Sequence, residues 1–524
     1  MNVKVCVEYN RTIVEGPPGT GKRTYLLKQV EKLLNEGIDI ERIGFFSFTT
    51  KAALESRTRA VKKFKLDPKK FVYFRTLHSL AHKIAISGPV TLFNEEQQKL
   101  FCDKYNLTWK DNDSSTRDIT GSSIINLITL AKNRMISLEQ QYNESNPNYP
   151  FSYLNKIFNL YNEYKKEEKL LDFSDIITKY NEVKDTPPLK ALFIDEAQDL
   201  NKLQCEMTTL MEQTSEHTWY AGDDDQAVHK WCGANPYFFI KLKGNIIQLT
   251  QSYRVPKTIA ELAKSLLPKI KTRRDKTWKA RQEEGIVKRC MYFSNLKIAD
   301  TPGTWYILTR NGYQLKDIKE FLRSEGIWFG SANKDRENVS SAVRKSVIEA
   351  IYTWVKLQKD MPITLEEVKT LYSYCKSLKK NSEEKDGIEW GFKNLSSFAP
   401  YKDDVEKTYK YKELVEKHGL KANIEYEWYE ILQNLSDLDI EYIKACRRRG
   451  EKLMQSPRVT ISTIHSIKGG EADHVALHSE INKIQYDSLM KGDDDEHRVF
   501  YVGITRAKKT LHIIESEKQW AYPI

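Results

Sequence analysis

Two glycines and a lysine near the start of the chain have the spacing of a phosphate-binding loop. In IVEGPPGTGKRTYLL, residues 13–27, Gly16, Gly21 and Lys22 fit the pattern G-x-x-x-x-G-K-[ST]. Such a loop turns backbone N–H groups toward phosphate oxygens, and the lysine adds a positive charge. The next position normally holds a Ser or Thr whose hydroxyl binds Mg²⁺, but here it is Arg23, with Thr24 one place late. The sequence therefore predicts phosphate binding beside an altered metal site.

Two adjacent acids follow an apolar stretch farther along the chain. The segment ALFIDEAQD, residues 191–199, is typical of a buried strand, and it ends in Asp195 and Glu196. Carboxylates at such a position are costly unless a cation lies beside them. We expect Asp195 to hold Mg²⁺ through water, and Glu196 to orient and deprotonate a water that attacks a phosphoryl group. Taken alone, the pair is also compatible with a simple capped strand end.

Buried strands and helices alternate around these residues, which favours an α/β fold with a parallel sheet. Residues 11–15, 43–49 and 191–199 have strand patterns, and apolar residues at helical spacing follow the glycine loop. Strand patterns that begin near residue 245 and return at 459–463 predict a second sheet core. Helical sequence interrupts both regions. We therefore expect two sheet cores, each with a mainly helical insertion.

The composition is that of a soluble globular chain with a modest basic excess. The 524 residues are 40% hydrophobic and 30% charged, and no apolar run approaches the roughly 20 residues of a membrane span. The seven cysteines include no C-x-x-C pair, which argues against zinc and fits a reducing cytoplasm. The net charge of +11 permits nucleic-acid binding without requiring it. We expect a cytoplasmic monomer that contacts no membrane.

Further motifs follow in an order that resembles superfamily 1A DNA helicases of the UvrD/Rep/PcrA type. The matching stretches are FSFTTKAA (46–53), TLHSLAHKI (76–84), LLDFSDII (170–177), AGDDDQAVHKWCGA (221–234), LTQSYRVP (249–256), TIHSIKGGEADHV (463–475) and EHRVFYVGITRAKKTL (496–511). The resemblance is nearly full length and implies two RecA-like parallel-sheet cores, 1A and 2A, with mainly helical insertions, 1B and 2B. The expected bounds are 1–88 with 188–255 for 1A, 89–187 for 1B, 256–360 with 456–524 for 2A, and 361–455 for a small 2B.

The resemblance implies that ATP and Mg²⁺ bind between the cores. Gln226 would sense the γ-phosphate, and Arg254 and Arg506 would be arginine fingers on the transferred phosphoryl group. Tyr253 would stack on the adenine, and Glu471 would contact the nucleotide near the ribose or γ-phosphate. The expected catalytic set is Lys22, Asp195, Glu196, Gln226, Arg254 and Arg506. The expected nucleotide contacts are Gly16, Pro17, Pro18, Gly19, Thr20, Gly21, Lys22, Arg23, Thr24, Tyr253 and Glu471.

The same resemblance implies a track for single-stranded DNA. Phe48 and Trp231 would stack on bases, while Thr49, Thr76 and His78 would bond phosphates. Stacking tolerates any base, which suits a protein that steps along a strand. A plain core position is the alternative for Phe48, and a hydrogen-bonded core histidine is the alternative for His78.

The implied activity is ATP-dependent 3′→5′ translocation along single-stranded DNA, with helicase action at duplex junctions. A DNA-stimulated ATPase that strips proteins, and an ATP- and DNA-binding clamp without turnover, are the alternatives. Arg23 puts a cation where Mg²⁺ is expected, so either hydrolysis is impaired or the substitution is tolerated. Two other departures concern Cys232, which replaces the usual arginine, and the absence of a glutamine before Gly16, which leaves base selectivity open.

Overall fold

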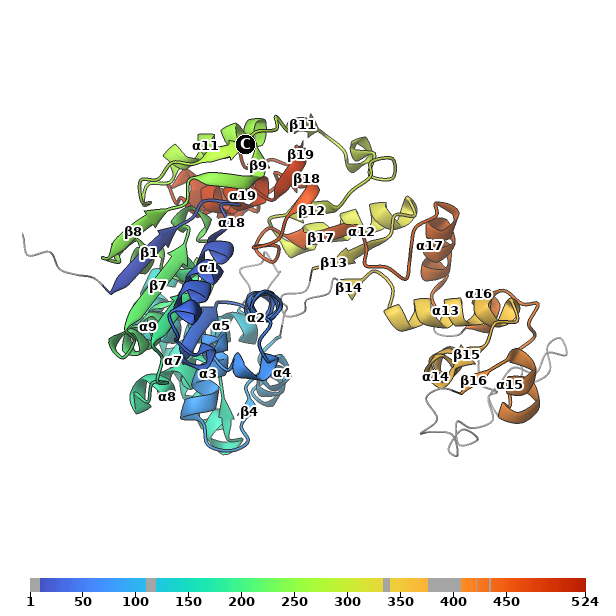
Figure 1. Ribbon diagram of the computed structural model, residues 1–524, viewed down its shortest axis with the longest axis horizontal. Coiled ribbons are helices and arrows are strands. Elements are labelled where there is room, and N and C mark those ends of the chain that lie inside the picture. Colours follow the sequence, from blue (N-terminus) through green and yellow to red (C-terminus); the bar gives the residue numbers. More distant parts are fainter. Residues whose placement is uncertain (1–9, 110–118, 333–339, 376–406, 421, 433–434) are drawn as a thin grey trace, which may run out of the picture.

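Two mainly parallel β-sheets form the centres of two α/β cores, which confirms the predicted fold class (Figure 1). The computed structural model describes residues 10–109, 119–332, 340–375, 407–420, 422–432 and 435–524. Residues 376–406 of the predicted 2B insertion lie outside the described residues. Among the helices of the described ranges, none combines the length and apolar character that a membrane span requires.

The first sheet has the strand order β3-β2-β6-β7-β1-β8, and its neighbouring strands all run parallel. The strands are β1 (Arg11–Glu15), β2 (Ile43–Ser47), β3 (Phe74–Thr76), β6 (Ala191–Ile194), β7 (His217–Gly222) and β8 (Asn245–Gln248). Strand β8 pairs with β1, which corrects the expectation from strand patterns that the second core begins near residue 245; the bounds implied by the family resemblance assign this stretch to 1A. An apolar strand pattern predicts a strand but carries no information about its partner.

Helices cover both faces of the first sheet. On one face lie α1 (Lys22–Asn35) and α2 (Thr50–Phe64). Leu26 and Val30 of α1 share a buried cluster with Phe45 and Phe193 of the strands, as expected for a helix with one apolar stripe. The opposite face is covered by α3 (Leu77–Ala85), α8 (Phe173–Val183), α9 (Lys202–Gln213) and α10 (Pro236–Lys241).

A mainly helical insertion follows α3. It contains α4 (Glu95–Lys104), α5 (Gly121–Arg134), α6 (Leu138–Ser145), α7 (Phe151–Glu167) and the short parallel pair β4 (Thr91–Leu92) and β5 (Leu170–Leu171). Phe101, Ile128 and Tyr161 belong to an apolar core of its own. Helix α8 packs instead on α3 and α9, although its residues lie inside the range predicted for 1B. The domain bounds remain predictions.

The second sheet has the strand order β11-β19-β18-β12-β17-β13-β14 and is parallel except for the pair β13 and β14. Its strands are β11 (Ile286–Cys290), β12 (Trp305–Thr309), β13 (Phe329–Ser331), β14 (Ser340–Ser341), β17 (Val459–Thr463), β18 (Ala472–His478) and β19 (Ala507–Ile514). Helices α11 (Lys257–Leu266) and α19 (Asp495–Ile504) cover one face, and α12 (Leu315–Ser324) covers the other. Helix α18 (Lys483–Met490) precedes α19. The chain passes between the cores along β9 (Gln251–Pro256), which pairs with β10 (Lys279–Arg281).

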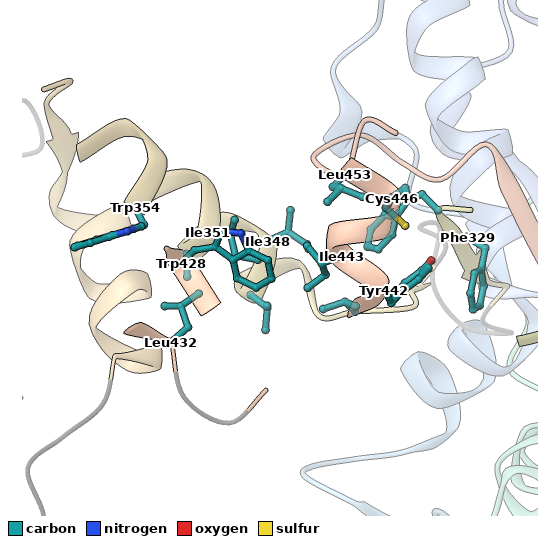
Figure 2. Packing of buried hydrophobic residues seen from close by; sticks show 14 of the residues in the cluster. Phe329, Ile348, Ile351, Trp354, Trp428, Leu432, Tyr442, Ile443, Cys446 and Leu453 are labelled. Atoms are coloured by element: carbon teal, nitrogen blue, oxygen red, sulfur yellow. The ribbon is translucent and has the colours of Figure 1, made fainter. Parts of the chain in front are cut away.

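A smaller lobe extends from the side of the second core (Figure 1). It consists of α13 (Lys345–Gln358), α14 (Leu365–Tyr374), α15 (Tyr411–His418), α16 (Trp428–Ile431), α17 (Asp437–Arg448), β15 (Ile363–Thr364) and β16 (Thr408–Tyr409). Figure 2 shows its buried side chains, from Trp354 and Trp428 in the lobe to Ile443 of α17 and Phe329 of the sheet. The lobe and the second sheet therefore share one apolar cluster.

Candidate active site

Three neighbouring strands bring the predicted catalytic residues to one edge of the first sheet. Strand β1 leads into the glycine loop, β6 into Asp195 and Glu196, and β7 into the turn that contains Gln226. Because β6, β7 and β1 are adjacent and parallel, their carboxyl ends lie at the same edge. Open parallel sheets bind their ligands at this edge.

Glycine is required at two positions of the loop by backbone conformation. Gly19 and Gly21 have φ angles of 73° and 81°, in the left-handed region that side chains disfavour. A Cβ atom on Gly19 would lie 2.4 Å from Cβ of Arg254, so a side chain here would also push β9 away. The Tyr253 N–H donates to the carbonyl of Gly19 at 2.9 Å. The loop is therefore packed directly against the strand that carries a predicted arginine finger.

Hydrogen bonds hold the rest of the loop in place. The Gly16 N–H donates to the carbonyl at the end of β7 at 3.0 Å. The hydroxyl of Thr20 donates to the carbonyl of Pro17 at 2.8 Å, and that of Ser252 donates to the carbonyl of Pro18 at 2.7 Å. These bonds fix the loop between β7 and β9, so its shape is set before any ligand binds.

Lys22 begins α1, and its side chain folds back over the loop. Its Nζ donates to the carbonyl of Gly16 at 2.6 Å. Burial lowers the pKa of Lys22, and the charges of Glu196 and Asp223 oppose this shift. A buried ammonium group gains most from an anion placed beside it, and a phosphate group in the loop would be such an anion.

Arg23 reaches the carboxylate that we predicted to hold the metal. Its Nε donates to Oδ2 of Asp195 at 2.6 Å, and its Nη1 donates to Oε2 of Glu55 at 2.7 Å. The side chain of Asp195 is 0% exposed and that of Arg23 is 17% exposed. Burial lowers the pKa of Arg23, but the charges of Asp195 and Glu196 outweigh burial and raise it, so the guanidinium stays charged. Thr24, the next residue, is exposed.

The residues at this position do not fit a bound Mg²⁺. Oδ2 of Asp195 accepts from Arg23, and Oδ1 accepts from the Glu196 N–H at 3.1 Å. Mg²⁺ requires oxygen ligands in near-octahedral arrangement, whereas Arg23 brings a cation to the place of the usual hydroxyl. Neither Asp195 nor Thr24 therefore has the surroundings of a metal ligand.

Glu196, the predicted general base, lies two residues after β6 and is partly buried. Its φ angle of 56° is unusual for a residue with a side chain, and such strain concentrates at functional sites. Its carboxylate accepts from Nε2 of Gln198 at 2.7 Å and lies 3.9 Å from Nζ of Lys468. Burial raises the pKa of Glu196, but the charges of Lys468, Lys22 and Arg23 outweigh burial and lower it. The carboxylate is thus ionised, and its role as general base stays a prediction, because a lowered pKa makes a carboxylate a weaker proton acceptor.

The predicted arginine fingers approach the site from β9 and from the end of α19. Arg506 is 1% exposed, and its Nη2 donates to Oε1 of Gln226 at 2.7 Å. Nε of Arg254 donates to Oε2 of Glu471 at 2.7 Å. Burial and the charge of Arg254 lower the pKa of Arg506 to about 9, so an anion placed beside this guanidinium would be favourable. Tyr253, beside Arg254, is 72% exposed and free to stack on a ring.

Lys468 is a candidate residue that the sequence analysis missed. It follows β17, and its Nζ contacts Asp199 and donates to the carbonyl of Gln226 at 2.6 Å. Burial raises the pKa of Asp199 to about 7, although the charge of Lys468 opposes this shift. Lys468 therefore connects the second core to acids of the first. It lies within TIHSIKGGEADHV, but its partners are far away in the sequence.

Lys276 is a second residue that the sequence patterns did not indicate, and it too connects the second core to acids of the first. Its Nζ lies 2.8 Å from Oδ1 of Asp223 and 3.2 Å from Oδ2 of Asp225. It also contacts Asp224, and all four side chains are almost fully buried. The isolated lysine in TRRDKTW has no pattern that predicts this contact. It fixes the turn that carries Gln226.

Three aromatic rings form a row beside the site. The ring of Phe48 stacks on that of His229 with centroids 5.1 Å apart, and the rings of His229 and Trp231 are 6.2 Å apart. Trp231 is 58% exposed, and Phe48 is partly buried. The rings come from the loops after β2 and β7. They form a surface on which bases could stack.

The predicted phosphate contacts lie at the starts of two helices. Thr49 and Thr76 cap α2 and α3, and each hydroxyl accepts a backbone N–H of its own helix at 3.2 Å. Helix N-termini attract phosphate because their free N–H groups and dipole carry partial positive charge. His78 packs edge-on against Phe173, and burial lowers its pKa to about 4, so it is neutral at pH 7. Its contact with phosphate remains a prediction.

The fold and the site together define a P-loop protein with two RecA-like cores. Comparison with known families is consistent with this class. Residues 2–246 match the UvrD/REP helicase N-terminal domain, and residues 331–518 match the UvrD-like helicase C-terminal domain. The chain belongs to the UvrD/Rep family of helicases.

Curated relatives extend the comparison. The chain is 27% identical over 272 residues to the ATP-dependent DNA helicase Rep of Buchnera aphidicola, a match that spans 48% of this chain and 39% of that protein. It is 23% identical over 597 residues to a probable DNA helicase II homolog of Mycoplasma genitalium, which covers 96% of this chain and 82% of the relative. A PcrA helicase of Leuconostoc citreum is 23% identical over 351 residues, 63% of this chain and 46% of the relative. The chain thus spans about two fifths of the Rep relative.

Proposed function

We propose that this protein is a DNA-stimulated ATP hydrolase that translocates 3′→5′ along single-stranded DNA and unwinds duplex DNA at junctions. The observation that carries the proposal is the bond of 2.7 Å between Arg506 and Gln226. Arg506 belongs to the second core and Gln226 to the turn after β7 of the first. The bond joins the two cores, and β7, which leads to Gln226, is the neighbour of β1, which leads into the glycine loop; this supports the role of Arg506 as a finger. The names of the relatives support the same activity.

Hydrolysis uses the chain's own acids and cations. The ionised carboxylate of Glu196 takes a proton from the attacking water. Lys22, Arg254 and Arg506 neutralise the charge that develops on the transferred phosphoryl group, which is the main catalytic requirement of phosphoryl transfer. The buried, cation-rich site holds these groups in place before ATP binds.

Coupling to DNA follows from the turn after β7. Gln226 bonds the finger from the second core, and Trp231, farther along the same segment, presents its ring for stacking. In the proposed cycle, loss of the γ-phosphate removes an anion that attracts cations of both cores, and separation of the cores would shift the rings along the strand. The 3′→5′ direction rests on the family resemblance.

Arg23 slows the chemical step in this proposal. Its ion pair with Asp195 occupies the carboxylate that family members are expected to turn toward Mg²⁺. The same ion pair favours a second candidate function, a clamp that binds ATP and DNA without turnover. Protein stripping with weak unwinding is a further variant of the motor.

Streptavidin displacement tests the proposal. Single-stranded oligonucleotides that carry biotin and streptavidin at either the 5′ or the 3′ end are incubated with the full chain and ATP. A 3′→5′ motor removes streptavidin from the 5′ end and leaves it at the 3′ end. Displacement from neither end, with intact ATP and DNA binding, favours the clamp. Displacement from the 3′ end alone contradicts the proposed direction.

A further inference from the structure

The contacts of Arg23 differ from what a magnesium-dependent phosphate loop requires. The guanidinium is fixed at both sides, by Asp195 at 2.6 Å and by Glu55 at 2.7 Å. Glu55 is itself held by Arg59 across one turn of α2. The guanidinium of Arg23 is therefore held within the site by two ion pairs and does not point into solvent.

A metal ion would have to break this arrangement in order to bind Asp195. The carboxylate is 0% exposed, and both of its oxygens already accept hydrogen bonds. Binding of the metal would therefore have to break the ion pair between Arg23 and Asp195, and this cost would be subtracted from the affinity of the metal. The usual hydroxyl ligand is also missing, because Thr24 is exposed. The metal thus loses two sources of affinity at once.

Arg23 adds a positive charge at the position of the usual Ser or Thr. A Ser or Thr at this position carries no charge, whereas Arg23 adds one cation to those of Lys22, Arg254 and Arg506. A nucleoside triphosphate without metal is more anionic than its magnesium complex, so it needs more protein cations. Within the described residues, Nη2 of Arg23 has no hydrogen-bond partner and remains available as a donor. Guanidinium groups are well suited to phosphate oxygens.

We infer that this site binds a nucleoside triphosphate without a divalent cation, with the guanidinium of Arg23 as the fixed cation beside Asp195. The inference rests on the proposed function, because it concerns the same nucleotide site. It adds that magnesium is not part of the binding step. Arg23→Thr should convert the site to magnesium-dependent binding, since it frees Asp195 and reduces the positive charge of the site.

The test measures nucleotide affinity with and without metal. The full-length protein is titrated with a fluorescent methylanthraniloyl derivative of ATP, in excess EDTA and in excess magnesium. The ratio of the two dissociation constants reports the coupling between metal and nucleotide. For the unmodified chain we expect a ratio below about fivefold, the lower end of ordinary coupling between sites. For Arg23→Thr we expect tighter binding in magnesium, with a ratio above about fivefold.

Lys28→Thr is the matched control. Lys28 is exposed on the same helix, so this change removes the same charge without touching Asp195. The ratio of its dissociation constants in EDTA and in magnesium should equal that of the unmodified chain. A ratio above about fivefold in the unmodified chain, or the same ratio in Arg23→Thr as in the unmodified chain, overturns the inference and leaves the proposed function intact. Failure of all three proteins to bind the probe in either condition contradicts the proposed function, and the inference with it.

Discussion

Removal of Arg506 is the sharpest test of how the two cores act on one nucleotide. Arginine has five N–H donors. Four of those in Arg506 are engaged, by the carbonyls of Val502 and Gly470, the carboxamide of Gln226 and the hydroxyl of Thr505. One donor and the positive charge therefore remain for the phosphoryl group.

The size of the effect follows from this count. An arginine finger is worth about 10³–10⁵ in rate. With one donor free, we expect the lower end, a loss of about a thousandfold for Arg506→Ala, or about 4 kcal/mol of transition-state stabilisation. Arg506→Lys keeps the charge but not the hydrogen bonds, so its hydrolysis rate should lie between those of the unmodified chain and Arg506→Ala. DNA binding should change little, because Arg506 is buried and its side-chain hydrogen bonds go to Val502, Gly470, Gln226 and Thr505 and not to the three rings.

The assay is steady-state phosphate release at saturating single-stranded DNA. Arg323→Ala serves as control, because Arg323 lies on α12 and pairs with Asp439 outside the site. Thermal unfolding of each protein shows whether the fold survives. A folded Arg506→Ala protein that turns over within about tenfold of the unmodified chain would refute the assignment of Arg506 as a finger.

Four further predictions follow from the site. Arg23→Thr should raise DNA-stimulated, magnesium-dependent phosphate release at least about tenfold, and equal rates across a magnesium titration would mean that Arg23 is tolerated. Affinity for single-stranded DNA, measured by fluorescence anisotropy, should fall steeply with salt because counterions are released; a flat dependence would contradict phosphate contacts. Trp231→Ala should weaken this binding by about 1–3 kcal/mol, whereas Tyr292→Ala, at an exposed aromatic elsewhere, should not. Lys276→Met should reduce the free energy of unfolding by about 3–5 kcal/mol, because it leaves the buried Asp223 and Asp224 without their ion-pair partner, and urea unfolding that matches the unmodified chain would contradict that pairing.

The glycine loop and the acids after β6 could be predicted because local sequence determines them. Gly19 and Gly21 are needed for a backbone that few other residues adopt, and a strand that ends in Asp195 is recognisable from its own residues. The meeting of Arg254 with the loop required the family resemblance, since no local pattern joins them.

The contact of Arg23 with Glu55 and the pairing of β8 with β1 could not be predicted from local patterns, because both depend on packing between distant segments. Glu55 lies on α2, and no spacing in the sequence connects it to α1. The partners of Lys276 and Lys468 likewise come from the other core. Charged residues that bridge sequence-distant elements have no periodic signal, whereas buried strands and helices do.

One measurement tests directly whether the two cores enclose an ATP-hydrolysing site that responds to DNA. Phosphate release is measured with and without a single-stranded oligonucleotide, for the unmodified chain, for Arg23→Thr and for each with Glu196→Gln, which removes the general base. We expect DNA to raise the rate in both proteins that retain Glu196, more strongly in Arg23→Thr, and Glu196→Gln to abolish the increase. A rate that DNA leaves unchanged in both proteins, or one that survives Glu196→Gln, would contradict this expectation.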